Sequence, residues 1–318
     1  MTAPGRPGSA LVIGEALVDV VIHPGQEPVD IPGGAPANVA LGLARLGRDV
    51  ELHCWIGTDE RGKAVRSHLE ASGVRLAPGA DGAARTSTAQ ATIGEDRAAS
   101  YVFDLDWNPP RPTLPDGQAP LLVHTGSIAA ILAPGATTVE QVLRETRATS
   151  TVAYDPNARP QLMGEPAGAR AIVERLVALS DLVKCSDEDI AWLYGIDAST
   201  DSALQDILND WLTRGPAVVV VTRGKHGALA MTASGLRLEV PAGSDVVVTD
   251  TVGAGDSFMG GLEDGLWAEN LVGADRREAL RAIDAATLER IVRHAAAIAD
   301  ITVSRAGANP PTRAELES

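Results

Sequence analysis

The 318-residue sequence predicts an α/β fold, namely a doubly wound, mostly parallel sheet with helices on both faces and a small β-sheet as a lid. From residue 121 onward, short runs rich in β-branched residues alternate with helical segments. Buried strands in that arrangement form a parallel sheet that helices cover on both sides. The lid is predicted because a hairpin over 86–103, turning at 94–96, is not followed by a helix and interrupts the alternation.

The first part of the chain is expected to begin the main sheet and the lid. A buried strand is predicted over 10–13, and a further strand within 17–22 joins the hairpin in the lid. A helix then runs from the glycine-rich segment 31–38 to Gly47, and another strand follows over 50–56.

The stretch 57–64 nearly matches the phosphate-binding P-loop pattern. Ala64 stands where that pattern requires a hydroxyl for Mg²⁺, and Asp59 and Glu60 would face the phosphate. We therefore predict a loop that leads into a helix.

The second half of the chain contains the repeated strand and helix units. Strands are predicted over 121–124, 151–154, 182–185, 217–221 and 245–249, and helices around 136–148, 167–179, 187–194, 201–214, 258–267 and 288–302. Ligands of such folds bind beyond the carboxyl ends of the strands. The polar segments after the strands are therefore candidates for the site: 155–159, 186–189, 222–227 and 250–256.

The composition restricts the partners. A net charge of −15 and a pI of about 4.8 argue against a surface for nucleic acid or an anionic membrane. The cysteines, Cys54 and Cys185, have no metal-type spacing, and a reducing cytoplasm fits them. The apolar run 11–13 is too short for a signal peptide or a membrane span.

The domain organisation follows from these elements. Segments 1–9 and 313–318 are expected to be terminal tails, which leaves 10–312 as one domain. The lid is expected to be inserted into it as two segments, about 15–32 and 86–108.

The stretch 250–258 is where we expect the chemistry. It lies between the predicted strand 245–249 and a helix, so Gly253 and Gly255 sit on a strand-to-helix turn, where glycine allows unusual backbone angles. The first N–H groups of a helix bind anions, and Asp256 could accept a proton beside such a site. The alternative interpretation is that Asp256 is an ordinary helix cap.

A second glycine turn occurs near the N-terminus. Gly33 and Gly34 precede a helix and would allow a ligand to approach the backbone, and the Asn38 amide suits a polyol hydroxyl. Taken alone, a pair of glycines before a helix is more often a tight connection.

The two turns together resemble the two signatures of the ribokinase-like (PfkB) carbohydrate kinases. Residues 33–40 read Gly-Gly-Ala-Pro-Ala-Asn-Val-Ala, and residues 250–256 read Asp-Thr-Val-Gly-Ala-Gly-Asp. Their order, spacing and strand and helix context fit that family over about 10–312. The resemblance implies an enzyme that phosphorylates a sugar or nucleoside hydroxyl with ATP.

The resemblance also implies roles for particular residues. Asp256 would be the general base, and Gly253, Ala254 and Gly255 would form the anion hole. The implied substrate contacts are Asp19, Gly33, Gly34, Asn38, Asn157 and Arg159; the implied nucleotide contacts are Ser186, Thr222, Gly224, Gly227 and His294. Asp189 would act on Mg²⁺ through water, and Asp250 would lie near a monovalent cation such as K⁺. His294 could also be an ordinary helix histidine.

Departures from the family pattern bear on the substrate. Ser186 stands where many relatives have asparagine, and no acidic residue of the kind that ribokinases use on ribose lies near the segment 124–127. The segments 14–19 and 155–160 are most similar to those of fructokinases, so a fructokinase-like sugar kinase is our first hypothesis.

Three other functions compete with this hypothesis. The segment 155–160 also resembles 2-keto-3-deoxygluconate kinases, in which Arg159, with Arg97 and Tyr101, could serve an acid sugar. A sugar- or nucleotide-binding sensor without turnover is disfavoured because a sensor does not need Asp256. A nicotinamide-binding site is disfavoured because Phe258 stands where a third glycine would fall. The expected partners are a sugar and ATP, without nucleic acid or membrane, and a homodimer through the lid.

Overall fold

The computed structural model describes residues 8–93, 99–113, 119–198, 201–244 and 246–317, and these form two sheets. The larger sheet has the strand order β13-β12-β11-β10-β9-β8-β1-β4-β5. Its strands are β1 (Ser9–Ile13), β4 (Asp49–His53), β5 (Arg75–Leu76), β8 (Leu122–Gly126), β9 (Thr151–Asp155), β10 (Leu182–Ser186), β11 (Val218–Thr222), β12 (Ala228–Thr232) and β13 (Arg237–Val240). The pairs from β11 to β5 are parallel, which confirms the predicted doubly wound sheet.

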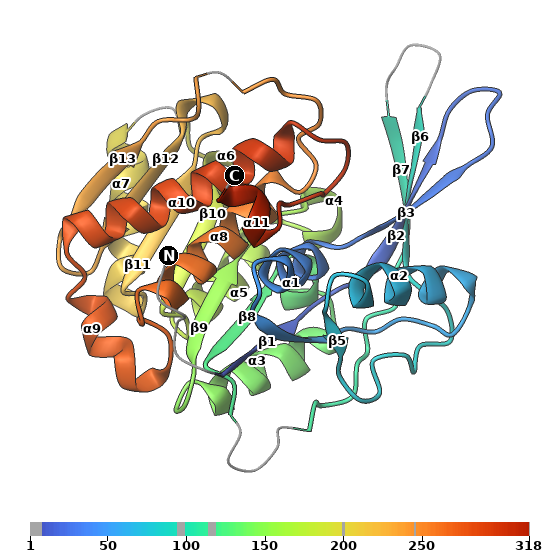
Figure 1. The fold of residues 1–318 in the computed structure, drawn as a ribbon, viewed down its shortest axis with the longest axis horizontal. Coiled ribbons are helices and arrows are strands. Elements are labelled where there is room, and N and C mark those ends of the chain that lie inside the picture. The colour runs from blue at the N-terminus through green and yellow to red at the C-terminus, as the bar shows by residue number, and fades with distance from the viewer. Residues whose placement is uncertain (1–7, 94–98, 114–118, 199–200, 245, 318) are drawn as a thin grey trace.

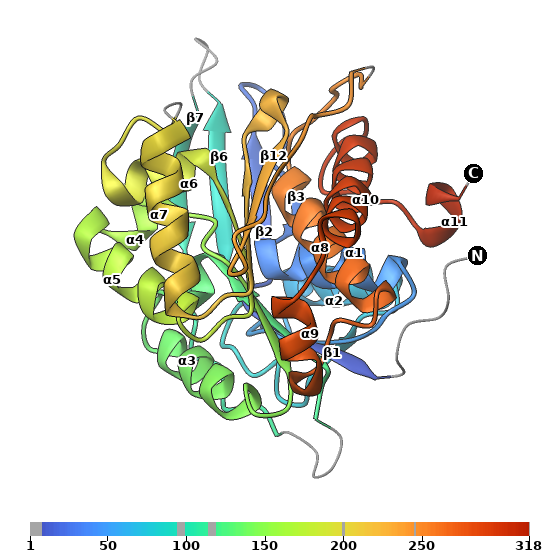
Figure 2. The ribbon, with the colours of Figure 1, turned by 90° about the vertical axis from the view of Figure 1, so that its left-hand side faces the viewer.

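Helices cover both faces of this sheet (Figure 2). One face carries α3 (Gly135–Thr146), α5 (Pro166–Val177), α6 (Asp187–Tyr194) and α7 (Asp201–Arg214), and the other carries α1 (Ala35–Arg45), α8 (Ala254–Ala268) and α10 (Ala285–Val303). Successive residues of a strand point to opposite faces, so Val12 of β1 joins one core cluster and Leu11 the other.

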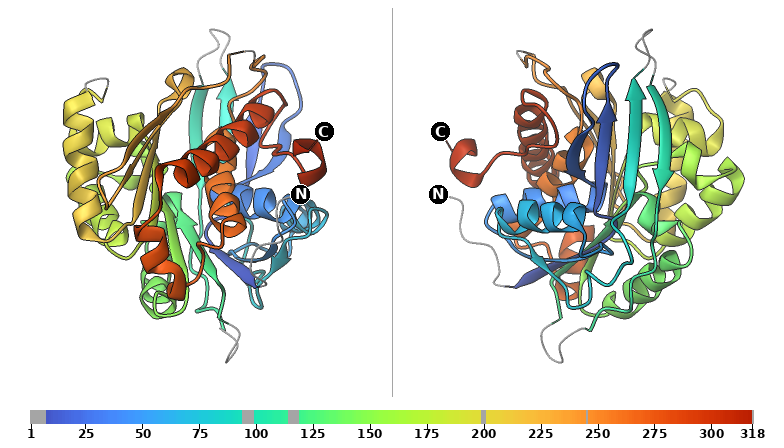
Figure 3. Two further views of the ribbon diagram at one scale, coloured as in Figure 1. Left: turned by 60° about the vertical axis from the view of Figure 1, so that its left-hand side comes forward. Right: turned by 90° about the vertical axis from the view of Figure 1, so that its right-hand side faces the viewer.

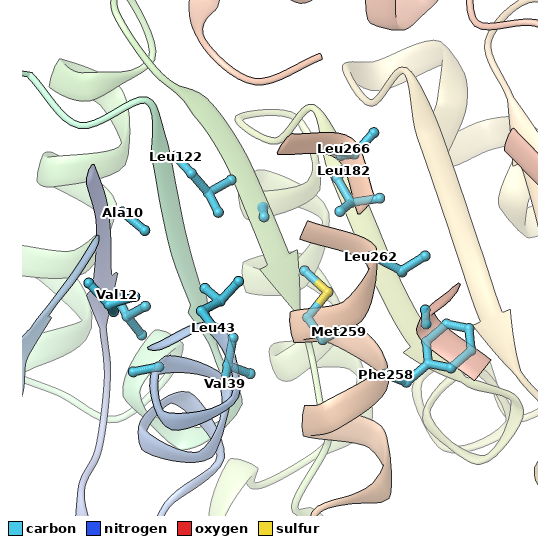
Figure 4. Packing of buried hydrophobic residues seen from close by; sticks show 14 of the residues in the cluster. Ala10, Val12, Val39, Leu43, Leu122, Leu182, Phe258, Met259, Leu262 and Leu266 are labelled. Atoms are coloured by element: carbon cyan, nitrogen blue, oxygen red, sulfur yellow. The ribbon is translucent and has the colours of Figure 1, made fainter. Parts of the chain in front are cut away.

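The core places α8 across the sheet. Val39 of α1 and Met259 and Leu262 of α8 are fully buried and pack over Val12 and Leu122 of the strands (Figure 4). Burying each such side chain contributes about 1.5–3 kcal/mol. This packing holds the first residues of α8 at the carboxyl ends of the strands.

The smaller sheet stands off the main body (Figures 1 and 3). Its order is β3-β2-β6-β7, formed by β2 (Leu17–Ile22), β3 (Val29–Gly33), β6 (Thr88–Ile93) and β7 (Ala99–Asp104). This confirms the predicted small sheet. The turn predicted at 94–96 lies outside the described residues.

The two faces of the smaller sheet have different surroundings. Val18 and Val20 are buried on the face that packs against α2 (Glu60–Glu70), and Asp30, paired with Val20, bonds Arg61 of that helix. Asp19 lies on the opposite face, because neighbouring residues of a strand point to opposite sides.

Two expectations about local structure were wrong. The β-branched run 245–249 was expected to be a strand, but the described residues 246–249 pair with no strand, and Val247 is 78% exposed. Thr249 instead donates its N–H to Val303 O. The C-terminal segment expected as a tail contains the helix α11 (Arg313–Leu316), which begins with a capping box between Thr312 and Glu315.

The antiparallel strands β12 and β13 and the short helices α4 (Pro160–Met163) and α9 (Arg277–Arg281) complete the fold. In the described part of the chain, no helix is both long enough and apolar enough to cross a membrane.

Candidate active site

A cleft of about 380 Å³ opens where the strand ends meet the first turn of α8. Its walls include Asn157, Arg159, Lys184, Asp189, Thr222 and Gly255. Asn157 and Arg159 follow β9, Asp189 follows β10, and Gly255 belongs to the glycine turn, whereas Lys184 and Thr222 lie on β10 and β11 themselves. The structure therefore brings the four predicted polar segments together in part. A broader depression of about 820 Å³, lined by Arg45, Arg305 and Glu315 among others, holds none of the predicted site residues.

Asp256 follows Gly255 in the first turn of α8 and bonds residues of two other segments. Its Oδ2 accepts a hydrogen bond from Asn38 Nδ2 at 2.8 Å, and its Oδ1 accepts a weaker one from Asn157 Nδ2 at 3.4 Å. The residue is 7% exposed. Burial raises the pKa of Asp256, and the bond from Asn38 and the charge of Lys184 oppose that rise. A buried carboxylate with a raised pKa is suited to accept a proton.

The glycine turn has the predicted position, but its two glycines serve different purposes. Gly253 caps α8 in the left-handed region, with φ of 75°, and a Cβ there would lie 2.5 Å from Ala308 Cβ. Gly255 lies inside the first turn without a positive φ, so the expectation that it takes unusual backbone angles was wrong. The N–H of Ala254 already donates to Thr251 O at 3.2 Å. The N–H groups that follow it in the first turn are therefore better suited to bind an anion.

Lys184 is the main site residue that sequence reasoning missed. It lies on β10, and its Nζ donates to Asp155 Oδ2 at 2.9 Å. Burial raises the pKa of Asp155 to about 6, so this pair is ionised at neutral pH. The available signal was a lysine in the apolar strand 182–185, one of three lysines in the chain.

Glu15 was also missed. It is buried, and its Oε2 accepts from Ala129 N at 3.2 Å, which fixes the loop after β8. Burial raises the pKa of Glu15 to about 7.

Asp19 faces the site from the smaller sheet. A Cβ on Gly33 would lie 2.3 Å from Asp19 Oδ2, so Gly33 gives the carboxylate its space. Burial raises the pKa of Asp19, the charge of Arg159 lowers it, and that of Asp256 raises it further. These interactions place Asp19 in the same electrostatic environment as Asp256. Gly34, with φ of 110°, packs against the Glu15 carbonyl, so a tight connection also accounts for it.

Arg159 is turned back onto its own loop. Its Nη1 donates to Asn157 Oδ1 at 2.6 Å and contacts the carbonyl oxygens of Asn157 and Ala158. The guanidinium therefore orients Asn157, which in turn bonds Asp256.

Ser186 and Asp189 form a capping box at the start of α6. Ser186 Oγ accepts from Asp189 N at 3.0 Å, and Asp189 Oδ2 accepts from Ser186 N at 2.8 Å. Asp189 Oδ1 also accepts from Ala158 N at 2.7 Å. Since both carboxylate oxygens already accept backbone bonds, Asp189 fits a role toward Mg²⁺ through water better than direct ligation. Within the ranges that the structure describes, no three His, Cys, Asp or Glu side chains are grouped to hold a metal.

Asp250 joins two loops beside the turn. Its Oδ1 accepts from Val252 N at 3.0 Å and its Oδ2 from Gly307 N at 2.8 Å. Thr222 and Gly224 line the cleft at the end of β11, whereas Gly227, with φ of 80°, lies under Val240 O, where a Cβ would be 2.0 Å away.

His294 is a predicted site residue that the structure places outside this group. Its Nε2 donates to Asp264 Oδ2 at 2.7 Å. Asp264 follows Asp256 on α8 by a rise of about 12 Å. His294 therefore belongs to an ion cluster at the other end of the helix, in agreement with the alternative of an ordinary helix histidine.

Comparison with known proteins agrees with this geometry. A sequence profile described as pfkB family carbohydrate kinase matches residues 9–315. A Klebsiella pneumoniae fructokinase is 34% identical over 276 residues, which cover 83% of this chain and 86% of that protein. A Rhizobium leguminosarum bv. trifolii fructokinase is 33% identical over 271 residues, with 82% and 81% covered.

Solved structures show the same fold. Fructokinase from Xylella fastidiosa with bound ATP superposes with a TM-score of 0.79 at 26% identity, covering 97% of each chain. A Vibrio cholerae O395 fructokinase double mutant bound to fructose, ADP and a potassium ion gives a TM-score of 0.77 at 27% identity, covering 98% of each chain.

Proposed function

Because the chain belongs to the pfkB family of carbohydrate kinases, we propose that this ATP-dependent carbohydrate kinase is fructokinase-like and acts on fructose. The observation that carries the proposal is the position of Asp256, bonded to Asn38 and Asn157 at the start of α8. A base, polyol-binding amides and an anion site then meet at one point.

The arrangement supports a direct transfer. Asp256 accepts the proton of the sugar hydroxyl as that oxygen forms its bond to the terminal phosphorus of ATP. The bond between that phosphorus and the bridging oxygen breaks, and ADP leaves with the electron pair. The first-turn N–H groups of α8 stabilise the phosphoryl oxygens, which carry the charge.

The proposal also includes positions for Mg²⁺ and for a monovalent cation. Mg²⁺ would neutralise charge on the ATP phosphates, with Asp189 holding it through water. A monovalent cation such as K⁺ would lie near Asp250, since a potassium ion is bound in the Vibrio cholerae fructokinase.

The acid-sugar alternative is not favoured. The two relatives named for the sequence comparison are fructokinases, and Nη1 of Arg159 already donates to Asn157 Oδ1. Arg97, the other arginine considered for that substrate, lies outside the described residues.

The decisive experiment is an ATP-consumption screen over fructose, tagatose, ribose, 2-keto-3-deoxygluconate and nucleosides. We expect fructose to give the highest kcat/KM. A clear preference for 2-keto-3-deoxygluconate or ribose would refute the fructokinase assignment, and no turnover with any of them would refute the proposed function as a whole.

We expect Asp19→Ala to raise the KM for the sugar strongly and to allow some ATP hydrolysis without sugar phosphorylation. Asp19 would bind the sugar from the smaller sheet, and that contact would close the lid and exclude water. The matched control is Asp30→Ala, on the opposite face of the same sheet, which loses only an exposed ion pair with Arg61. Equal KM values for both variants would contradict the role of Asp19.

Hydrogen exchange tests the lid itself. Amides of β2, β6 and β7 should exchange more slowly with fructose than with ATP alone, because the sugar's contacts drive closure. If exchange in these strands does not respond to any accepted sugar, the lid assignment fails even for an active kinase.

The lid also carries the surface that we propose for a homodimer. Val29, Ile31 and Tyr101 are exposed and lie on the same face of the sheet as Asp19. We expect Ile31→Glu to shift the mass measured by light scattering from dimer to monomer. A wild-type chain that is monomeric at assay concentration would contradict this.

A further inference from the structure

A buried ammonium group lies directly beneath the first turn of α8. The Lys184 side chain is 4% exposed and is held by Asp155 at 2.9 Å. Lys184 also lines the cleft together with Gly255. The other two lysines, Lys63 and Lys225, are exposed.

The surroundings keep this lysine charged. Burial alone would lower the pKa of Lys184, but the carboxylates of Asp155, Asp189 and Asp256 outweigh it and raise the pKa. A buried ion pair adds little to the stability of a fold, because the free energy needed to remove two charges from water offsets much of their mutual attraction. Stability alone therefore does not explain a lysine here.

Gly255 supplies an independent observation. Its backbone has no positive φ, so it does not need glycine for conformational reasons. A Cβ at this position would lie 2.8 Å from Lys184 Nζ. The missing side chain therefore leaves open the path from the ammonium group to the space above the first turn, where the proposed anion site lies.

We propose that Lys184 is a further catalytic residue, whose ammonium group contacts the transferring phosphoryl oxygens through the opening that Gly255 leaves in α8. The proposal rests on the proposed kinase function. Lys184 keeps its protons throughout, since the hydroxyl proton goes to Asp256, and it supplies only positive charge. Such charge acts most strongly in the transition state, when it is fixed in a water-poor site.

The first test removes the charge without leaving a buried unpaired partner. The double variant Lys184→Met/Asp155→Asn should fold, with sugar KM within about threefold of wild type. Its kcat should fall by about 10²–10³-fold, as for loss of one oxyanion-stabilising group. Its affinity for ADP with aluminium fluoride and fructose, a mimic of the transition state, should fall far more than its affinity for ADP. A folded double variant with wild-type kcat overturns the proposal.

The second test leaves both charged residues in the chain and decides the matter if the double variant does not fold. In Gly255→Ala the new methyl group must displace the flexible end of Lys184, and kcat should fall at least about tenfold. The control is Gly260→Ala in the same helix, where a Cβ would meet Val39 O at an ordinary 3.6 Å. Unchanged kcat in Gly255→Ala overturns the proposal. A wild-type chain that phosphorylates no sugar would instead refute the proposed function.

Discussion

Asp256→Asn is expected to lower kcat by about 10²–10⁴-fold with fructose, the range for loss of a general base. Asparagine has nearly the same shape and can still accept from Asn38, which donates to Asp256 at 2.8 Å. The fold should therefore persist. Steady-state kinetics and a thermal melt of the same preparation measure both effects.

The sign of the stability change adds a second check. Because burial raises the pKa of Asp256, the unfolded chain gives up this proton at lower pH than the folded chain, and ionisation costs stability at neutral pH. Asp256→Asn removes that cost, so its Tm should equal or exceed that of wild type. The control Glu269→Gln changes a half-buried carboxylate just after α8 that pairs with Arg290, and it should leave kcat unchanged. Wild-type kcat in Asp256→Asn would remove Asp256 from the mechanism.

The main sheet could be predicted because its parallel strands are buried on both faces, as the run Val218–Val221 shows. The same reasoning failed for the run 245–249, where the described residues 246–249 pair with no strand and Val247 and Val248 lie exposed. A hydrophobic pattern indicates which side chains are apolar, but whether the segment pairs as a strand depends on a neighbouring strand that lies elsewhere in the sequence. Strands β12 and β13, which extend one side of the sheet, were missed for a related reason, since they pair antiparallel through short turns.

The candidate site could likewise be predicted only in part. Asn38 and Asp256 are 218 positions apart and still meet, because each lies in the first turn of a helix at the same edge of the sheet. Lys184 could not be distinguished from a strand residue whose charged end reaches solvent. Its importance depends on Gly255 and Asp155, which approach it only in three dimensions. The bond between His294 and Asp264 could not be predicted either, because Asp264 is a buried carboxylate that the local sequence pattern does not reveal.

Asp264 is the centre of a cluster of ion pairs and hydrogen bonds that holds the C-terminal part of α8 in place. Its oxygens accept from Arg48 at 2.7 Å, Arg313 at 2.6 Å and His294 at 2.7 Å, while Asp264 itself is fully buried. Burial alone would raise the pKa of Asp264, but the bond from His294 and the charges of both arginines outweigh it and lower the pKa to about 2. The cluster thus joins α8 to α10, to α11 and to the segment after α1.

We expect Asp264→Ala to lower the free energy of unfolding by about 3–5 kcal/mol, because it leaves partly buried cations without their anion. Arg293→Ala, which breaks an exposed pair with Glu289, should change the free energy of unfolding by less than about 1 kcal/mol.

Since the pKa of Asp264 is depressed, the stability that Asp264 contributes is present above the unfolded pKa near 4 and is lost as pH falls toward 2. Urea unfolding at several pH values should therefore show the advantage of wild type over Asp264→Asn shrinking between pH 4 and pH 2. Folded Asp264→Ala should keep kcat within about threefold, because the site lies roughly 12 Å away along α8. A loss of less than about 1 kcal/mol would mean that the arginines hold α8 without this carboxylate.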